Sequence, residues 1–595
     1  MAKRTISGKA FDVFILKRIY TFVKPYKKKF NLAIALTLVI AFLSPVRPIL
    51  IQYTIDHYIM AFDKKGLLIM MVVMTLLLLF QTLIQYYHTY ITSWLGQVVI
   101  RDLRVKLFRH ISQLRLKYFD HTPIGTLVTR TISDLETIAD IFSEGLIVII
   151  GDLLQLFVII GVMFFIDWRL TLISLSTFPI LFVATRVFQK GINKTFREVR
   201  TQVALLNTFV QEHITGMSVV QAFNREDEEL RRFKSINKEH MKAHVRSVWY
   251  YSIFFPVVEL LSATSIGLLV WWGSHGVILG DVSLGNVIAF IMFINMLFRP
   301  IRELADKFNT LQMGMVSSER VFRVLDTKEF ISDEGQVVKS IKGKIHFKNV
   351  WFAYNDHPIM QNAEPEWILK DISFEAQPGE MLALIGATGA GKSSIINLVG
   401  RLYEFQKGNI LIDDINIRDY NLIELRKQIA VVLQDVFLFS DTIFNNITLN
   451  DPAVSKEKVI EASKTIGAHD FISRLPGNYD FNVMERGAML SVGQRQLISF
   501  IRAYIFNPKL LILDEATSSI DSESEELMQR AISKLTYQRT SIVIAHRLAT
   551  IQNADRIIVL DHGRKVEEGN HQQLLKQNGL YRELYEIQFE SSDRK

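Results

Sequence analysis

The sequence predicts an all-α domain of six membrane-spanning helices fused to a mixed α/β domain. Nearly all of the long uncharged runs lie before residue 300, and from about Gly343 the chain changes to short strands, glycine turns and amphipathic helices. A chain of 595 residues is also too long for one ordinary core. We therefore expect four parts, which are a basic amino-terminal segment (1–29), a helical membrane domain (30–325), a linker (326–342) and the α/β domain (343–595).

Six apolar stretches are close to the ~20 residues that a helix needs to cross a bilayer. They cover residues 30–55, 67–95, 145–166, 168–187, 252–279 and 282–301. The second stretch has no charged residue, which disfavours a buried helix of a soluble core. The long connections 97–144 and 188–251 are polar and helical in pattern, and we expect them to continue the membrane helices into the cytoplasm. An amphipathic helix lying on the membrane surface is the alternative for the first connection.

Charge and composition narrow the possible partners. The net charge is +8, and nine Lys and Arg crowd the first 29 residues, just before the first apolar run. This placement is typical of attraction to an anionic cytoplasmic leaflet rather than to nucleic acid, and it predicts a multi-pass membrane protein with both termini in the cytoplasm. We find no pattern of a removable signal peptide. The absence of cysteine excludes disulfides, thiolate zinc sites and a cysteine nucleophile.

Several charged residues lie inside predicted spans. Arg186 and Glu259 come near the inner interface, where a structural role is expected, and the three that we single out are Arg47, Asp152 and Arg299. A charge in a span costs ~2.5–3.5 kcal/mol on insertion scales, and it usually faces a partner or an aqueous cavity. We expect these three side chains to line an internal cavity. An ion pair between Asp152 and either arginine explains their presence equally well.

The α/β domain contains a sequence typical of a phosphate-binding loop. Residues 386–393 read Gly-Ala-Thr-Gly-Ala-Gly-Lys-Ser, between a buried strand predicted at Met381–Ile385 and an apolar helix. This is the Walker A pattern of P-loop NTPases in its required strand–loop–helix setting. Lys392 supplies charge to the terminal phosphates of ATP, and the Ser393 hydroxyl can ligate Mg²⁺. The expected ATP-binding residues of this loop are Gly386, Ala387, Thr388, Gly389, Ala390, Gly391, Lys392, Ser393 and Ser394.

A second strand ends in two carboxylates. Residues 510–515 read Leu-Leu-Ile-Leu-Asp-Glu, and four consecutive apolar residues indicate a parallel strand buried on both faces. Asp514 is then placed to hold Mg²⁺ through its water shell, and Glu515 to orient the attacking water or accept its proton. A helix-capping role for the pair is the alternative.

Residues 490–496 read Leu-Ser-Val-Gly-Gln-Arg-Gln, between the phosphate loop and Asp514. This combination resembles the ATP-binding cassette (ABC) transporters, whose signature is L-S-G-G-Q. The resemblance implies that Ser491, Gly493 and Gln494 contact nucleotide. It covers almost the whole chain and is closest to bacterial lipid-flippase and multidrug half-transporters.

The resemblance assigns further residues in chain order. It implies that Tyr354 stacks on adenine, that Gln434 senses Mg²⁺ and the membrane domain, and that His546 contacts the γ-phosphate. The D-loop matches 519–521. Tyr118-Phe119-Asp120 and residues 212–226 resemble the two coupling-helix regions of bacterial exporters.

Family mechanism then implies a dimer, in which each of two ATP molecules lies between the phosphate loop of one subunit and the signature of the other. Two departures stand out, Val492 at the third signature position and Asn482 where an acid is common. The family contains heterodimers with one weakened site, but the intact Glu515 and His546 favour a homodimer. We expect ATP-driven export or flipping of an amphipathic molecule, an anionic lipid or drug, across the bacterial inner membrane. A soluble ABC ATPase and an ATP-gated channel are the competing classes.

Overall fold

The computed structural model describes residues 12–331, 333–355, 365–514, 522–545 and 548–587. The chain divides into two compact units. The first holds Met1–Ser112 and Ile124–Thr327, and the second holds Gln113–Pro123 and Lys328–Lys595. Residues Gln113–Pro123, a short part of the long connection 97–144, therefore pack with the α/β unit.

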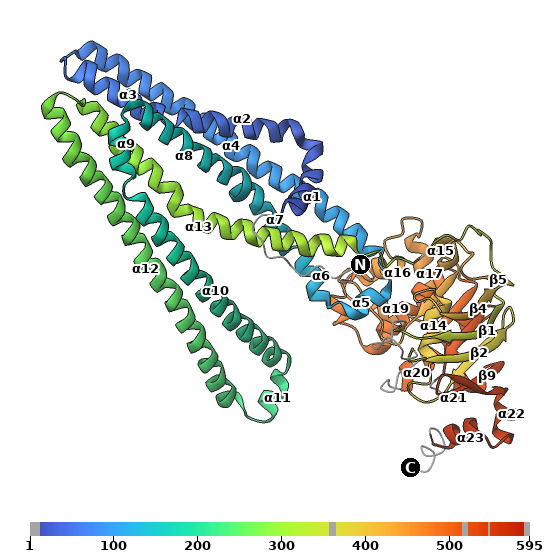
Figure 1. The fold of residues 1–595 in the computed structure, drawn as a ribbon. Coiled ribbons are helices and arrows are strands. Elements are labelled where there is room, and N and C mark those ends of the chain that lie inside the picture. The colour runs from blue at the N-terminus through green and yellow to red at the C-terminus, as the bar shows by residue number, and fades with distance from the viewer. Residues whose placement is uncertain (1–11, 332, 356–364, 515–521, 546–547, 588–595) are drawn as a thin grey trace. The chain divides into compact units, whose positions relative to one another are not determined.

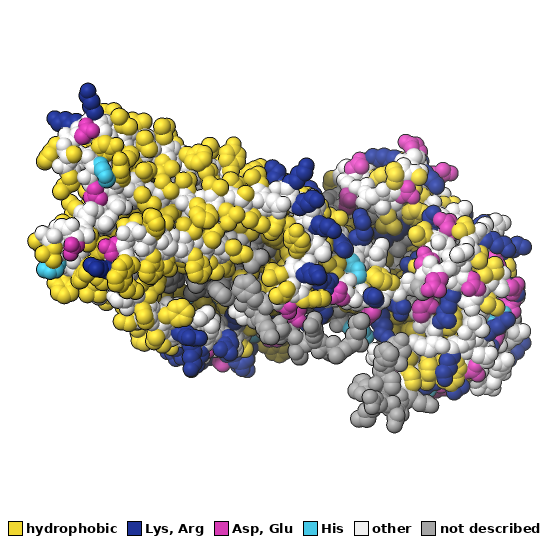
Figure 2. All heavy atoms as spheres, turned by 45° about the horizontal axis from the view of Figure 1, so that its top comes forward, with side chains coloured by type: hydrophobic (Ala, Val, Ile, Leu, Met, Phe, Trp, Pro, Cys, Tyr) yellow, Lys and Arg dark blue, Asp and Glu magenta, His cyan; other side chains and the backbone are white. Residues whose placement is uncertain are grey.

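The first unit is helical throughout (Figure 1). Its helices are α1 (Val13–Val23), α2 (Lys27–Leu43), α3 (Val46–Thr54), α4 (Lys64–Ser112), α6 (Ile124–Thr131), α7 (Ser133–Asp140), α8 (Leu146–Ile166), α9 (Trp168–Leu175), α10 (Phe178–Thr215), α11 (Met217–Ala222), α12 (Glu226–Leu279) and α13 (Leu284–Asp326). In the described residues, five helical stretches are long and apolar enough to cross a membrane, and the sixth predicted span is the apolar first part of α13, Leu284–Pro300. Hydrophobic side chains cover most of the visible face of this unit (Figure 2).

The long connections 97–144 and 188–251 largely continue the membrane helices, as the sequence predicts. Helix α4 runs on to Ser112, α10 runs to Thr215, and α12 begins at Glu226. On α4, Leu103 and Leu107 are fully buried against other helices, so this stretch does not lie on a membrane surface.

Local chemistry explains where the longest helix begins and ends. The first turn of α12 carries four acidic residues, 226–229, which stabilise a helix amino terminus. The helix ends at Gly280, whose φ of 80° a residue with a side chain adopts only at a cost. Helices α10 and α12 lie side by side and are joined by α11 (Figure 1). Phe188, Phe254 and Phe290 belong to the core that these helices share with α13.

The second unit is a mixed α/β structure with two sheets. The larger sheet has the order β10-β9-β3-β8-β7-β6, and all of its pairings are parallel except that of β9 with β10. The smaller sheet, β2-β1-β4-β5, is antiparallel. The strands are β1 (Ile345–Phe352), β2 (Leu369–Ala376), β3 (Met381–Ile385), β4 (Lys407–Ile412), β5 (Ile415–Asn416), β6 (Ile429–Val432), β7 (Leu510–Asp514), β8 (Thr540–Ile544), β9 (Arg556–Asp561) and β10 (Arg564–Gly569).

Helices pack around these sheets and bury the apolar faces of the central strands. They are α5 (Leu116–His121), α14 (Lys392–Val399), α15 (Leu422–Arg426), α16 (Ile443–Thr448), α17 (Lys456–Ile466), α18 (His469–Ser473), α19 (Val492–Ile505), α20 (Ser522–Thr536), α21 (Leu548–Gln552), α22 (His571–Lys576) and α23 (Leu580–Tyr585). Strands β7 and β8 are buried on both faces, and in β7 this matches the four consecutive apolar residues before Asp514. The carboxyl ends of parallel strands form one edge, and ligands of such sheets bind there.

Candidate functional site

The phosphate loop connects β3 to α14 at this edge of the larger sheet. Gly386 has a φ of 154°, and a Cβ atom there would lie 2.2 Å from the carbonyl oxygen of Leu560. Gly391 directly precedes α14 with a φ of 98°. Only glycine allows this path of the backbone, and the loop leads into a helix amino terminus, which favours bound phosphate.

Lys392 folds back over the loop that it follows. Its Nζ donates hydrogen bonds to the carbonyl oxygens of Gly386 (2.6 Å) and Ala387 (3.0 Å). The side chain is almost fully buried, and this burial lowers the pKa of Lys392, while the nearby Asp514 acts in the opposite direction. The ammonium group therefore lies at the mouth of the phosphate loop, where it can move to a phosphate oxygen.

Asp514, at the carboxyl end of β7, lies beside the same loop. Burial raises the pKa of Asp514, and both the charge of Lys392 and a hydrogen bond with Ser393 oppose that rise. The Ser393 hydroxyl and the Asp514 carboxylate are oxygen ligands of the kind that Mg²⁺ prefers. Within the described residues no cluster of three His, Cys, Asp or Glu could hold a metal by itself. Such a pair fits a magnesium ion that takes its other ligands from phosphate and water.

Tyr354 follows β1 and contacts the first turn of α14. Its hydroxyl lies 3.1 Å from Oγ of Ser394. Its ring packs edge-to-face on Phe352 (4.8 Å between centroids) and on Tyr403 (5.1 Å). The structure thus brings Tyr354 to the helix that carries Lys392 and Ser393.

Gln434 is exposed and comes two residues after β6. Because β6 pairs with β7 in parallel, Gln434 lies at the same sheet edge as Asp514. Glu515, Asp521 and His546 lie outside the described residues.

The Leu-Ser-Val-Gly-Gln segment begins α19. The Ser491 side chain caps this helix by accepting a hydrogen bond from the backbone N–H of Gln494 (3.2 Å), and the Gln494 side chain accepts one from the N–H of Ser491 (3.0 Å). Val492 occupies the first turn of α19 and is 49% exposed. The sequence contains the signal for this reciprocal cap, which is a serine followed three residues later by glutamine.

All three charged residues predicted to line a cavity do so in the helical unit. We call this hollow of about 760 Å³ the polar chamber; its wall includes Arg47, Asp152 and Arg299. The alternative explanation, an ion pair of Asp152 with either arginine, is wrong, because Asp152 pairs with Nζ of Lys307 at 2.7 Å. The physical reason is the length of α13, which continues beyond the predicted end of the span and brings Lys307 alongside α8.

Comparisons with known proteins decide the family. Residues 30–301 match the family model of the ABC transporter transmembrane region, and residues 369–518 match that of the ABC transporter. The uncharacterized ABC transporter ATP-binding protein YknV of Bacillus subtilis is 38% identical over 591 residues, which are 99% of this chain and 96% of that protein. The chain belongs to the ABC transporters.

Two further relatives agree with this assignment. The putative multidrug export ATP-binding/permease protein YgaD of Bacillus subtilis is 36% identical, over 96% of this chain and 99% of that protein. The ATP-dependent lipid A-core flippase of Syntrophus aciditrophicus is 34% identical, over 99% of this chain and 96% of the relative. This ABC transporter is an ATPase coupled to export or flipping across a membrane, with its membrane domain and its cassette on one chain.

The coupling segment of this ABC transporter packs with its cassette. Helix α5 carries Tyr118, Phe119 and Asp120, and the hydroxyl of Tyr403 donates a hydrogen bond to the Asp120 carboxylate. Tyr403 also contacts Tyr354, so a continuous set of contacts runs from Ser394 on α14 to Asp120 on α5. Tyr403 could not be predicted from the sequence, because a tyrosine that follows a helix has no local signal for such a contact.

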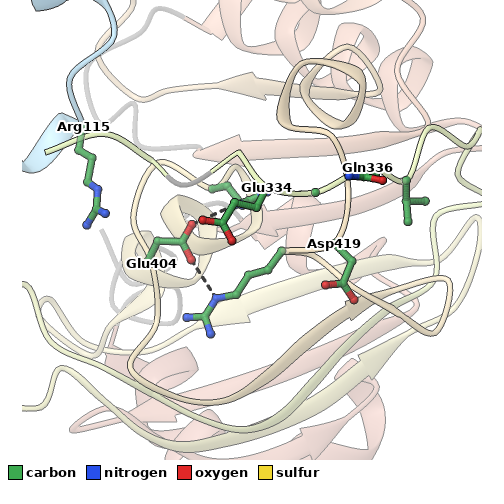
Figure 3. Close-up of a pocket in the computed structure, with 9 residues that line it drawn as sticks. Arg115, Glu334, Gln336, Glu404 and Asp419 are labelled. Atoms are coloured by element: carbon green, nitrogen blue, oxygen red, sulfur yellow. Dashed lines mark hydrogen bonds and ion pairs between the residues drawn. The ribbon is translucent and has the colours of Figure 1, made fainter. Parts of the chain in front are cut away.

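A hollow of the cassette unit, about 640 Å³, has linker residues in its wall (Figure 3). Arg115 and Glu334 lie at its wall, and Glu404 forms ion pairs with Arg401 (3.2 Å) and Arg418 (3.0 Å). The backbone of Arg115 donates to the carbonyl oxygen of Glu329 at 2.9 Å. These contacts fasten the linker and the coupling segment to the cassette, which is a structural role.

Proposed function

We propose that this chain works as a homodimer that exports or flips an amphipathic small molecule or lipid, with MgATP as its energy source. The observation that carries the substrate class is the polar chamber, a hollow with charged and amide side chains inside an apolar helical bundle. A charge in a membrane span is retained where it faces a cavity or a partner. Multidrug export and lipid A-core flipping by the relatives support the same class of substrate.

The proposed catalytic roles follow the placement of the side chains. Lys392 and the backbone of 386–391 bind the phosphates, and Tyr354 stacks on adenine. Ser393 and Asp514, with Gln434 nearby, hold Mg²⁺, which neutralises charge on the phosphates when bound. Glu515 orients the attacking water, and His546 contacts the γ-phosphate. Ser491, Gly493 and Gln494 bind the nucleotide held by the partner subunit.

Two features support the dimer. One chain has one phosphate loop and one signature, whereas each ATP in this family is held by both. In addition, the tip formed by α11 exposes apolar side chains: Ile214 is 67% exposed, Val219 is 59% exposed and Phe223 is 73% exposed. The acidic first turn of α12 follows this tip directly, so the tip does not lie in lipid. Apolar side chains exposed in an aqueous setting indicate a protein partner.

The proposed location is the bacterial inner membrane, with both termini and the cassette in the cytoplasm. The cationic residues of α1 and of the start of α2 support this orientation, because Lys27, Lys28 and Lys29 directly precede the first apolar run.

A flipping assay tests the proposed function. The purified chain is reconstituted in vesicles with fluorescent lipids or drugs, and ATP is added on the cassette side. We expect ATP-dependent movement of one class of amphiphile by the chain alone. Movement without ATP would indicate a channel, and failure of well-folded protein to form an active dimer would indicate a missing partner chain.

A further inference from the structure

Two hollows in the helical unit meet at one arginine. The polar chamber draws its wall from α2, α3, α4, α8 and α13. A second hollow of about 740 Å³ runs along α4 and includes Leu78, Tyr86 and Tyr90; we call it the tyrosine hollow. The two hollows share Arg47, Gln81, Gln85 and Thr89. A single elongated molecule can therefore occupy both.

The hollows differ in chemistry. The polar chamber also contains Asp152, His88 and Asn295, whereas the tyrosine hollow is lined by Leu78, Tyr86 and Tyr90 beside Arg47 and uncharged amide and hydroxyl side chains. Leu78 is 46% exposed, Tyr86 is 62% exposed and Tyr90 is 57% exposed, with the two tyrosine rings stacked one helical turn apart. An aromatic body with a polar tip suits the boundary between an apolar chain and a polar head.

Arg47 is the group at the junction that lacks a partner. Among the residues that the structure describes, none forms a hydrogen bond or an ion pair with Arg47. The other charges of the chamber are engaged, since Asp152 pairs with Lys307 and Arg299 also interacts with a neighbour. A guanidinium within a span faces an aqueous cavity or an anionic partner, and its fork of donors fits carboxylate and phosphate.

We infer that the transported molecule is an amphiphile with an acidic head group, a phosphate or a carboxylate, that binds Arg47 and extends its apolar tail along the tyrosine hollow. This inference rests on the proposed function and names the substrate class of its cavity. A cationic head group is repelled by the charge of Arg47, and Asp152 is already paired with Lys307. The chamber therefore selects against a cationic head group.

His88 is a buried polar side chain in the wall of the polar chamber, and it is 8% exposed. The Thr37 hydroxyl donates to the carbonyl oxygen of Ala33 (2.9 Å), so its oxygen accepts from Nε2–H of His88 (2.9 Å). The buried Nδ1 of His88 is then an acceptor, and it has no partner among the described residues.

Equilibrium binding to the purified full chain without nucleotide tests the inference, with native mass spectrometry as the readout. The probes are lysophosphatidic acid and lysophosphatidylcholine of one chain length, a fatty acid of that length, and inorganic phosphate. We expect the two acidic amphiphiles to bind about tenfold more tightly than the choline lipid, because a charge-assisted pair is among the stronger hydrogen bonds. Arg47→Gln abolishes this preference and Arg47→Lys keeps part of it. The control Arg169→Gln, outside both hollows, keeps all of it.

A second variant tests the placement of the apolar tail along the tyrosine hollow. Tyr86→Ser with Tyr90→Ser weakens the binding of lysophosphatidic acid several-fold and leaves that of inorganic phosphate unchanged. Equal affinity for acidic and choline lipids in the parent, or an unchanged preference in folded Arg47→Gln, overturns the inference. A tyrosine variant that loses the dimer but binds the amphiphile normally shows that the hollow is a subunit contact, and the tail assignment is then wrong.

The proposed function fails in a different way. Glu515→Gln binds the acidic amphiphile as the parent does, because no step of binding needs hydrolysis. If the parent shows the acidic preference but no ATP-driven movement, the function is wrong and the head-group inference stands. If movement occurs without that preference, the function stands and the inference is wrong.

Discussion

At the scale of single residues, the chemistry of the cassette is concentrated in a few buried groups. Lys392, Ser393 and Asp514 meet at the end of β7, where a cation and a carboxylate share a site that is poorly solvated. Burial outweighs their mutual attraction, since it lowers the pKa of Lys392 and raises the pKa of Asp514. Lys392 therefore loses its proton, and Asp514 gains one, more readily than an exposed side chain of the same type. Bound phosphate favours the charged form of Lys392, and a bound metal ion favours that of Asp514.

The raised pKa of Asp514 predicts a pH dependence of magnesium binding. As the pH falls, Asp514 takes up a proton at a higher pH than an ordinary aspartate, whose pKa is about 3.9. Fluorescent nucleotide binding, measured with and without Mg²⁺ across this acid range, should lose its magnesium-dependent part first. In Asp514→Asn that part is absent at every pH. An identical pH profile for the parent with and without Mg²⁺ would contradict the assignment.

Val492 tests the homodimer proposal at the level of one side chain. Its side chain is exposed, and the cap formed by Ser491 and Gln494 does not depend on it. If both sites of a homodimer work as they stand, Val492→Gly should keep ATP hydrolysis within about twofold of the parent, a change of less than about 0.5 kcal/mol in activation free energy. A tenfold gain in steady-state hydrolysis would instead mean that valine weakens the site and would support a heterodimer.

At the scale of elements, helix α5 packs with the cassette although its chain neighbours belong to the helical unit. Tyr403 is buried and holds Asp120 of α5, while its ring contacts Tyr354. This arrangement lets the nucleotide side of the cassette and the coupling segment share one side chain. Burial raises the pKa of the Tyr403 hydroxyl, which therefore stays a donor to the carboxylate at physiological pH.

Removing that hydroxyl should uncouple the two parts. Tyr403→Phe keeps the ring packing and loses the hydrogen bond, with a cost in stability of about 1 kcal/mol. We expect basal ATP hydrolysis to persist and its stimulation by substrate to fall. A double-mutant cycle with Asp120→Asn checks the contact, since the second substitution should add little once the first is made. Fully additive effects would contradict a direct role.

Much of each element could be predicted from local sequence, and the contacts between elements could not. The phosphate loop, the buried strand before Asp514 and the helical continuation of the membrane spans all have short-range signals, and the structure has these elements. The pairing of Asp152 with Lys307 depends on how far α13 continues and on its register against α8, residues that are distant in the chain. The contact of Tyr403 with Asp120 likewise spans 283 residues. Neither leaves a pattern in composition or periodicity.

At the scale of the whole molecule, one chain supplies half of each proposed ATP site. The proposed dimer would use the tip at α11 as a surface for the partner subunit. Its position is held by the ion pair of His213 with Glu229, at 2.8 Å, which joins the end of α10 to the start of α12. The exposed apolar side chains between them contribute little to the fold of the single chain.

Polar substitution at that tip should weaken the assembly more than the fold. For Val219→Ser with Phe223→Ser we expect loss of the dimer, seen by light scattering after size-exclusion chromatography, and a fall in ATP hydrolysis. Thermal stability should stay nearly unchanged, because both side chains are exposed. The matched control is Ile278→Ser, which changes an exposed apolar residue near the other end of α12. Equal loss of dimer in the control would contradict a specific partner surface.

The most direct test of the central claim is steady-state ATP hydrolysis by the chain purified alone in lipid, beside Glu515→Gln. A self-sufficient ATP-driven transporter predicts hydrolysis that responds to an amphiphile and falls at least about a hundredfold in the variant, as expected when the group that orients the attacking water is lost. Near-zero hydrolysis by well-folded parent protein, or hydrolysis that persists in Glu515→Gln, would contradict it.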